Sequence, residues 1–154
     1  MSFGLGKLKV DSAAVVYFSP DWLDGSIKMR PATSENAEYV SAMLSLDHEA
    51  AIKKLNHAQN RRDEQLIKSA LKNLERVQNQ VYKDVFPKHV FVGWENIQDE
   101  NGNDVEFSVE AAKEFMEELS AYPREFNELI KFAGDPENFR EVSSEKLAEE
   151  LAGN

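Results

Sequence analysis

The chain has 154 residues, 42% hydrophobic and 10% aromatic, which fits one folded domain and excludes a disordered chain. Cysteine is absent, which excludes disulfides, thiolate catalysis and cysteine-based zinc sites. The net charge of −10 divides into −2 over residues 1–47, +4 over residues 48–90 and −12 over residues 91–154. The acidic last third argues against duplex DNA binding and suits either solubility or a basic protein partner.

The first predicted elements are two short strands. Residues 15–18 are β-branched and aromatic and are followed by a Ser-Pro pair, which is typical of a strand that ends in a turn. Asp24-Gly25 is a turn pair, and apolar and polar residues alternate over residues 26–30 after it. Together the two segments predict a β-hairpin.

Two helices are predicted next. Thr33 or Ser34 can cap the first helix, which continues to about Leu46. Asp47 can cap the second helix, whose apolar face consists of Ala51, Leu55 and Ala58. The apolar pattern then lapses over residues 56–63, which predicts a helix break there.

The clearest periodic segment is a long amphipathic helix over about residues 64–86. Its apolar residues recur at spacings of three and four, namely Leu66, Ile67, Ala70, Leu71, Leu74, Val77, Val81 and Val85. Pro87 is expected to stop it. Such a length allows two interpretations: the helix packs in the protein's own core, or it forms an arm that pairs with a partner. We expect the first.

A second hairpin is predicted after Pro87, because the apolar period changes to two. Residues 89–94 and 105–107 have strand character, and Asn101-Gly102 supplies a turn between them.

Helical segments are predicted over the rest of the chain. Ser108 can cap a helix over residues 109–120, and Pro123 can begin another that ends at Gly134. A short helical turn follows, and residues 145–151 predict a last, glutamate-rich helix.

These elements predict a mainly α (α+β) fold, a helical domain with one or two short β-hairpins. We expect a single domain over residues 1–140, followed by an acidic, frayed tail over residues 141–154.

No set of residues predicts catalysis, a metal or a cofactor. The three histidines, His48, His57 and His89, lack the spacing of a metal pair, and no nucleophile motif or glycine-rich phosphate loop is present. We therefore expect that the protein is not an enzyme and has no metal or cofactor.

One segment superficially resembles a calcium-binding EF-hand loop. Asp99, Asn101, Asn103 and Glu110 match positions 1, 3, 5 and 12 of that loop. Position 6, where the loop needs glycine, is Asp104, and the flanks have strand character instead of helical character. We therefore interpret the segment as a hairpin turn.

Nucleic acids and membranes are not predicted as partners. The basic pairs Lys53-Lys54 and Arg61-Arg62 have no interleaved aromatic residues on which bases could stack. No apolar run is long enough for a signal peptide or a membrane span.

Residues 91–139 carry the most distinctive pattern, FVGWENIQDENGNDVEFS followed by VEAAKEFMEELSAYPREFNELIKFAGDPENF. An apolar strand ends in Gly-Trp, an acidic Asp-x-x-Gly turn and a Phe-Ser pair follow, and two helices end near an aromatic residue. This layout resembles the carboxyl-terminal half of the tail assembly chaperones of long-tailed bacteriophages, and it covers about a third of the chain.

The resemblance implies a protein of the bacterial host cytoplasm that binds the phage tape measure protein and keeps it soluble during tail assembly. It also allows contact with the tail tube protein, and a homo-oligomer is left open. The residues chosen as candidate contacts with the partner are Trp94, Phe132 and Phe139. Two alternatives remain: an acidic DNA mimic that inhibits a host nucleic-acid-binding protein, and a structural head–tail connector subunit.

Overall fold

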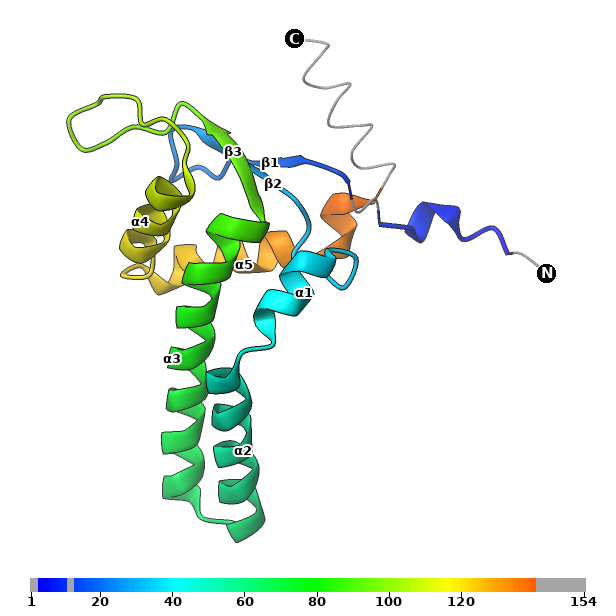
Figure 1. Cartoon of the computed structure of the whole chain (residues 1–154), viewed down its shortest axis with the longest axis vertical. Helices are drawn as coiled ribbons and strands as arrows, with labels where there is room; N and C mark the ends of the chain where they lie inside the picture. Colours follow the sequence, from blue (N-terminus) through cyan, green and yellow to red (C-terminus); the bar gives the residue numbers. More distant parts are fainter. Residues whose placement is uncertain (1–2, 11–12, 141–154) are drawn as a thin grey trace.

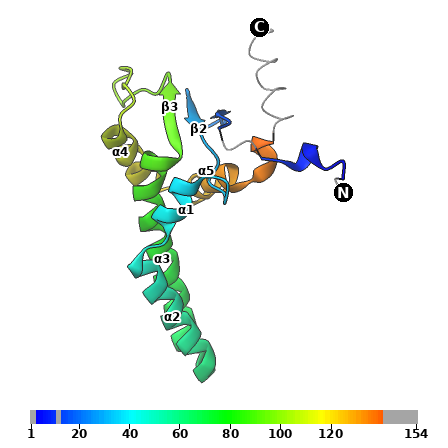
Figure 2. The ribbon, with the colours of Figure 1, turned by 45° about the vertical axis from the view of Figure 1, so that its right-hand side comes forward.

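The computed structural model describes residues 3–10 and 13–140, which form a head and a projecting helical arm (Figure 1). The head contains a small sheet, the helices packed against it, and the carboxyl-terminal end of the longest helix. The arm consists of two antiparallel helices that extend away from the sheet (Figure 2). The mainly α (α+β) prediction is confirmed.

The sheet has three antiparallel strands in the order β1 (Val16–Phe18), β2 (Ser26–Met29) and β3 (Phe91–Glu95). Val16 pairs with Met29 and Phe18 with Ile27, so the hairpin predicted around Asp24-Gly25 is confirmed.

The second predicted hairpin is wrong in its partner, because β3 pairs with β2 and not with residues 105–107. A turn does form at residues 99–103, closed by an isolated bridge between Gln98 and Asp104. Residues 105–107 are not a strand. Strand character in a sequence does not identify the strand with which a segment pairs. The free edge of β2 offers β3 a longer run of pairing residues than residues 105–107 do.

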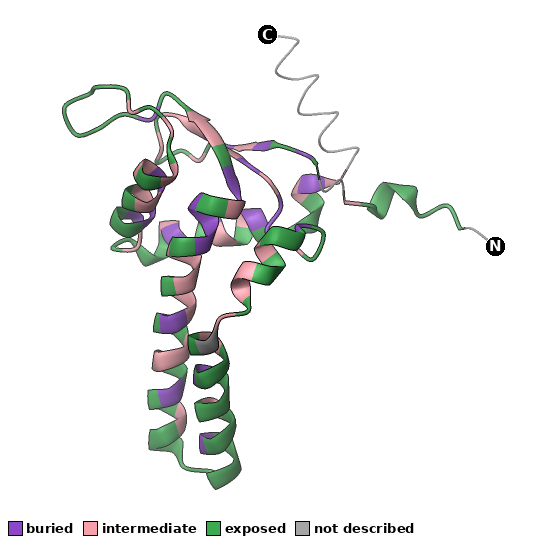
Figure 3. Cartoon of the chain, viewed as in Figure 1, coloured by how far each residue is buried: buried purple, intermediate pink, exposed green. Residues whose placement is uncertain are grey.

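The core lies between the sheet and the helices α3 (Glu64–His89), α4 (Val109–Leu119) and α5 (Pro123–Gly134). Figure 3 shows buried residues concentrated in the head and only sparse along the arm. The largest fully buried side chains in the described residues include Phe86, Phe126, Phe139, Ile27, Met29, Met116 and Leu129.

The predicted caps of α4 and α5 agree with the structure. The Ser108 hydroxyl accepts a hydrogen bond from the backbone N–H of Ala111, and Pro123 occupies the first turn of α5. The predicted turn after Gly134 is the 3₁₀ helix η2 (Pro136–Phe139). A second 3₁₀ turn, η1 (Gly6–Leu8), lies near the amino-terminal end.

Two predicted caps are wrong. The helix α1 (Ala37–Met43) is capped by Asn36, whose side chain accepts from the Tyr39 N–H, because the Thr33 and Ser34 hydroxyls bond Glu35 instead. Ser45 caps α2 (Leu46–Arg61) in place of Asp47, so this helix begins two residues earlier than a cap at Asp47 would allow.

The predicted boundaries of the arm helices also differ from the structure. The helix α2 continues to Arg61, and the break is confined to Arg62, which has φ of 54°, and Asp63. Pro87 does not stop α3, which ends at His89. A proline so near the end of a helix removes a single backbone hydrogen bond, and burial of its ring in the head offsets that loss.

The helix predicted over residues 145–151 and the tail over residues 141–154 lie outside the described residues. Within those described, no helix has both the length and the apolar character that crossing a membrane requires.

Candidate partner-binding groove

The arm is a helical hairpin held together by small side chains. The residues buried between α2 and α3 are Ala51, Ala58, Ala70 and Val77. Small side chains allow the two helices to approach closely, but they fill little of the space above the line of contact. The result is a long depression along one face of the arm.

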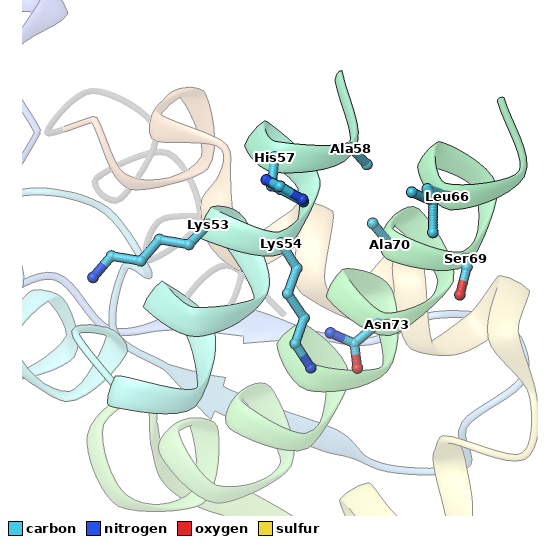
Figure 4. A pocket seen from close by; sticks show the side chains of 8 residues that line it. All are labelled: Lys53, Lys54, His57, Ala58, Leu66, Ser69, Ala70 and Asn73. Carbon is cyan, nitrogen blue, oxygen red and sulfur yellow. The ribbon is translucent and has the colours of Figure 1, made fainter. Parts of the chain in front are cut away.

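Two adjoining hollows make up this depression. The one nearer the arm tip has a volume of about 510 Å³ and is lined by Lys53, Lys54, His57, Ala58, Leu66, Ser69, Ala70 and Asn73 (Figure 4). The one nearer the head has a volume of about 270 Å³ and is lined by Asp47, Ala50, Ala51, Lys54, Asn73, Arg76, Val77, Gln80 and Val81. Because Lys54 and Asn73 line both, the hollows form one continuous surface, which we call the arm groove.

The rim of the arm groove is basic. Lys53, Lys54 and Arg76 outnumber the single carboxylate of Asp47. None of the three basic side chains forms an ion pair within the described part of the chain. Figure 4 shows Lys54 and Asn73 near one another across the groove, whereas Lys53 extends away from α3. The Arg76 guanidinium donates to the Asn73 side-chain oxygen at 3.1 Å.

The floor of the arm groove is apolar, and it consists of largely buried small side chains together with one exposed leucine. Leu66 lines it and is 41% exposed. A two-helix hairpin can bury only the sides of the helices that face each other, and most helical stability in proteins comes from packing of an apolar face. A third amphipathic helix laid along the groove would cover this floor, and acidic side chains at its edges would meet Lys54 and Arg76. The geometry therefore suits an apolar helix with acidic flanks.

The comparison with family models decides the origin of the chain. The model of the YdaY prophage protein family matches residues 35–150, about three quarters of the sequence. The chain belongs to the YdaY prophage protein family. It is therefore phage-derived, and the match includes the whole arm, β3, α4 and α5. No curated protein and no solved structure matches the chain.

The contact residues predicted from the sequence lie in the head of this prophage protein and not on the arm. Trp94 is half-buried, its indole N–H donates to the Val105 carbonyl at 2.7 Å, and its ring packs edge-on against Phe107. Phe132 is half-buried and packs against Phe18 in a tilted arrangement, at a centroid distance of 5.0 Å. Phe139 is fully buried, so its ring is not available at the surface. A role of Trp94 and Phe132 in partner contact stays a prediction.

The arm groove was not predicted from the sequence. A signal was present, because Ala51, Ala58 and Ala70 recur on the faces that pack together while basic residues lie beside them. The first half of α3 projects from the head and packs against α2, whereas the second alternative for the long helix, an arm that pairs with a partner, stays a prediction.

The loop that resembles an EF-hand is organised by one carboxylate. One oxygen of Asp99 accepts from the backbone N–H groups of Asn101 and Asn103, at 2.9 and 3.0 Å. The loop follows β3 and is closed by a bridge, whereas an EF-hand loop joins two helices. Among the described residues, no three His, Asp or Glu side chains are grouped so that they could hold a metal ion.

Proposed function

We propose that this prophage protein is a tail assembly chaperone, not an enzyme, and that it acts in the host cytoplasm. In this proposal it binds the tape measure protein through the arm groove and keeps that protein soluble during tail assembly. The observation that carries the proposal is the groove itself: an apolar floor with an exposed leucine and a basic rim, on an arm that projects from the head. The phage family and the pattern of residues 91–139 support the same conclusion.

The chemistry of a tape measure protein suits this surface. The resemblance implies a long, helical partner with a tendency to form coiled coils, and such helices expose apolar stripes until they are packed. A stripe covered by the arm groove is no longer free to aggregate. The carboxylates beyond residue 90 then keep the complex in solution, since surplus charge of one sign opposes association.

Co-expression tests the proposal. The tape measure protein of the same prophage is produced with and without this chain, and its soluble fraction is measured. We expect a several-fold larger soluble fraction when the chain is present. Equal solubility in both conditions contradicts the proposal.

A pair of leucine variants tests the groove. Leu66 and Leu71 are 41% and 49% exposed on the same helix, but only Leu66 lines the groove. We expect Leu66→Ser to reduce capture of the tape measure protein and Leu71→Ser to leave it unchanged. Because both side chains are exposed, neither substitution should change the free energy of unfolding by more than about 0.5 kcal/mol.

Three alternatives predict different results. A head–tail connector subunit remains in finished particles, whereas mass spectrometry should find a chaperone absent from them. A DNA mimic competes with duplex DNA for a basic host protein. The basic rim of the arm groove is unfavourable for binding such a protein. Turnover of a small substrate that depends on one side chain of this protein would point to an enzyme.

A further inference from the structure

The head carries a second exposed apolar surface, separate from the arm groove. It is a hollow of about 360 Å³ between the β1–β2 turn and the α4–α5 turn, lined by Trp22, Leu23, Phe115, Leu119 and Tyr122. Trp22 is 36% exposed and Tyr122 is 62% exposed, so two aromatic rings face solvent. We call this surface the head hollow.

Carboxylates surround these rings. Glu118 and Glu125 line the head hollow, and neither forms an ion pair within the described residues. The indole N–H of Trp22 donates to the Glu128 carboxylate at 2.5 Å, which fixes the orientation of the ring. Two basic side chains, Arg124 and Lys131, line the adjoining hollow, where Asp21, Glu125 and Glu128 balance them.

Aromatic faces flanked by carboxylates recognise guanidinium groups. Arginine stacks on Trp and Tyr rings through its planar cation and forms bidentate bonds with carboxylates. A ligand for the head hollow should therefore present exposed arginines at the end of a protruding element.

The arm tip has that chemistry. Arg61 and Arg62 are consecutive, exposed, and free of ion pairs in the part of the chain that the structure describes. Arg62 has a left-handed conformation with φ of 54°, at the apex of the turn between α2 and α3. The tip lies at the opposite end of the molecule from the head, so it cannot reach its own head hollow (Figures 1 and 2).

We propose that the arm tip of one copy docks into the head hollow of a second copy, with Arg61 and Arg62 against Trp22, Tyr122, Glu118 and Glu125. The contact joins two different surfaces, so it is heterologous, and it leaves a free tip and a free hollow at the two ends of every assembly that does not close into a ring. Copies therefore add in series. Overall repulsion between chains of net charge −10 is screened beyond about 8 Å in physiological salt, whereas the local pairs are in contact. The inference goes beyond the proposed function and does not need it.

Charge reversal on each side tests the contact. Sedimentation velocity of the wild-type chain over a concentration series should show growing oligomers, and these should diminish as salt is raised. We expect Arg61→Glu/Arg62→Glu, and separately Glu118→Arg/Glu125→Arg, to weaken the association by on the order of tenfold or more.

A mixture of the two reversed variants gives the sharpest result. In each variant alone, the tip and the hollow carry charge of the same sign and repel each other. In the mixture, the reversed tip of one variant can meet the reversed hollow of the other, so opposite charges face each other again. Oligomers should therefore return in the mixture. The control is Lys68→Glu/Lys72→Glu, which changes the net charge as much as reversal of the tip but on the side of the arm, and it should leave the association intact.

Three results would overturn the inference: a wild-type chain that stays monomeric throughout the series, a mixture that remains as monomeric as its components, or a control that dissociates as fully as the tip variant. None of these results depends on the tape measure protein. A tip variant that no longer self-associates but still captures that protein would leave the proposed function standing.

Discussion

The side-chain amide of Asn36 joins the start of α1 to the end of α3 by donating a hydrogen bond to the backbone carbonyl of His89 at 2.9 Å. The same nitrogen donates to the Pro31 carbonyl at 2.9 Å, and the side-chain oxygen accepts from the Tyr39 N–H. Asn36 is fully buried. One amide therefore links the exit of β2, the start of α1 and the end of α3, and it satisfies all three backbone groups.

Substitution of Asn36 should destabilise the head. Asn36→Ala removes a helix cap and leaves one buried and one partly buried carbonyl without their donor, at a cost of about 2–3 kcal/mol in the free energy of unfolding. Asn36→Asp keeps the cap acceptor but places a carboxylate against both carbonyls, so we expect it to be no more stable than the alanine variant. Urea unfolding measures both variants. If the aspartate variant has a free energy of unfolding close to that of the wild type, the helix cap alone accounts for the contribution of Asn36.

Gly25 is required by a close approach of two backbones. A Cβ atom at this position would overlap the backbone of Glu95 and Asn96, at the end of β3. Gly25→Ala should therefore reduce the free energy of unfolding by about 1–3 kcal/mol. Gly93 is the matched control, because a Cβ there would meet only the flexible side chain of Lys28 at 3.6 Å. Equal melting temperatures for the two alanine variants would contradict the prediction.

Tyr39 should make the fold sensitive to alkali. Burial of its ring, with a smaller effect of Tyr82, raises the pKa of Tyr39 to about 12. Below about pH 10 both the folded and the unfolded chain keep the phenolic proton. Between about pH 10 and 12 the unfolded chain releases it first, so stability falls as the pH rises through that window. For a half-buried ring the loss is roughly 1–2 kcal/mol.

The comparison with Tyr39→Phe isolates this effect from other alkaline titrations. The phenylalanine ring retains the edge-on contact with Phe86, whose centroid lies 6.1 Å away, but it has no proton to lose. Denaturant midpoints measured at about pH 9 and about pH 11 should diverge for the wild type more than for the variant. Equal losses in both proteins would mean that Tyr39 contributes nothing to alkaline lability.

The sequence predicted many of the parts of the fold whose signals are local, although the Ser45 cap of α2 was missed. Ser108 and Pro123 mark helix starts through bonds and dihedral angles that lie within one turn, and both agree with the structure. Asn36 could not be predicted, since its role depends on the carbonyl of His89, which is 53 residues away. The partner of β3 was missed for the same reason, because pairing with β2 is a long-range contact.

The candidate site was harder to predict than the fold. Aromatic residues such as Phe139 attract attention as contact residues, yet a large apolar ring is the side chain that a core buries most readily. The arm groove consists of alanines and lysines, which carry little signal individually. The groove forms only because α2 and α3 lie side by side in the folded chain.

Reversal of the groove's charge should weaken binding of the tape measure protein without affecting the fold. Lys54 and Arg76 are exposed on the rim, and acidic flanks of a bound helix would lie beside them. We expect Lys54→Glu/Arg76→Glu to reduce capture by on the order of tenfold, since each lost charge pair becomes a like-charge contact. Lys68→Glu/Lys72→Glu is the control, with the same change in net charge on residues of α3 that do not line the groove. Pull-down of the tape measure protein by each variant measures the effect. Equal losses in the two variants would show that total charge, and not the groove, governs binding, whereas no loss in either would exclude the basic rim from the contact.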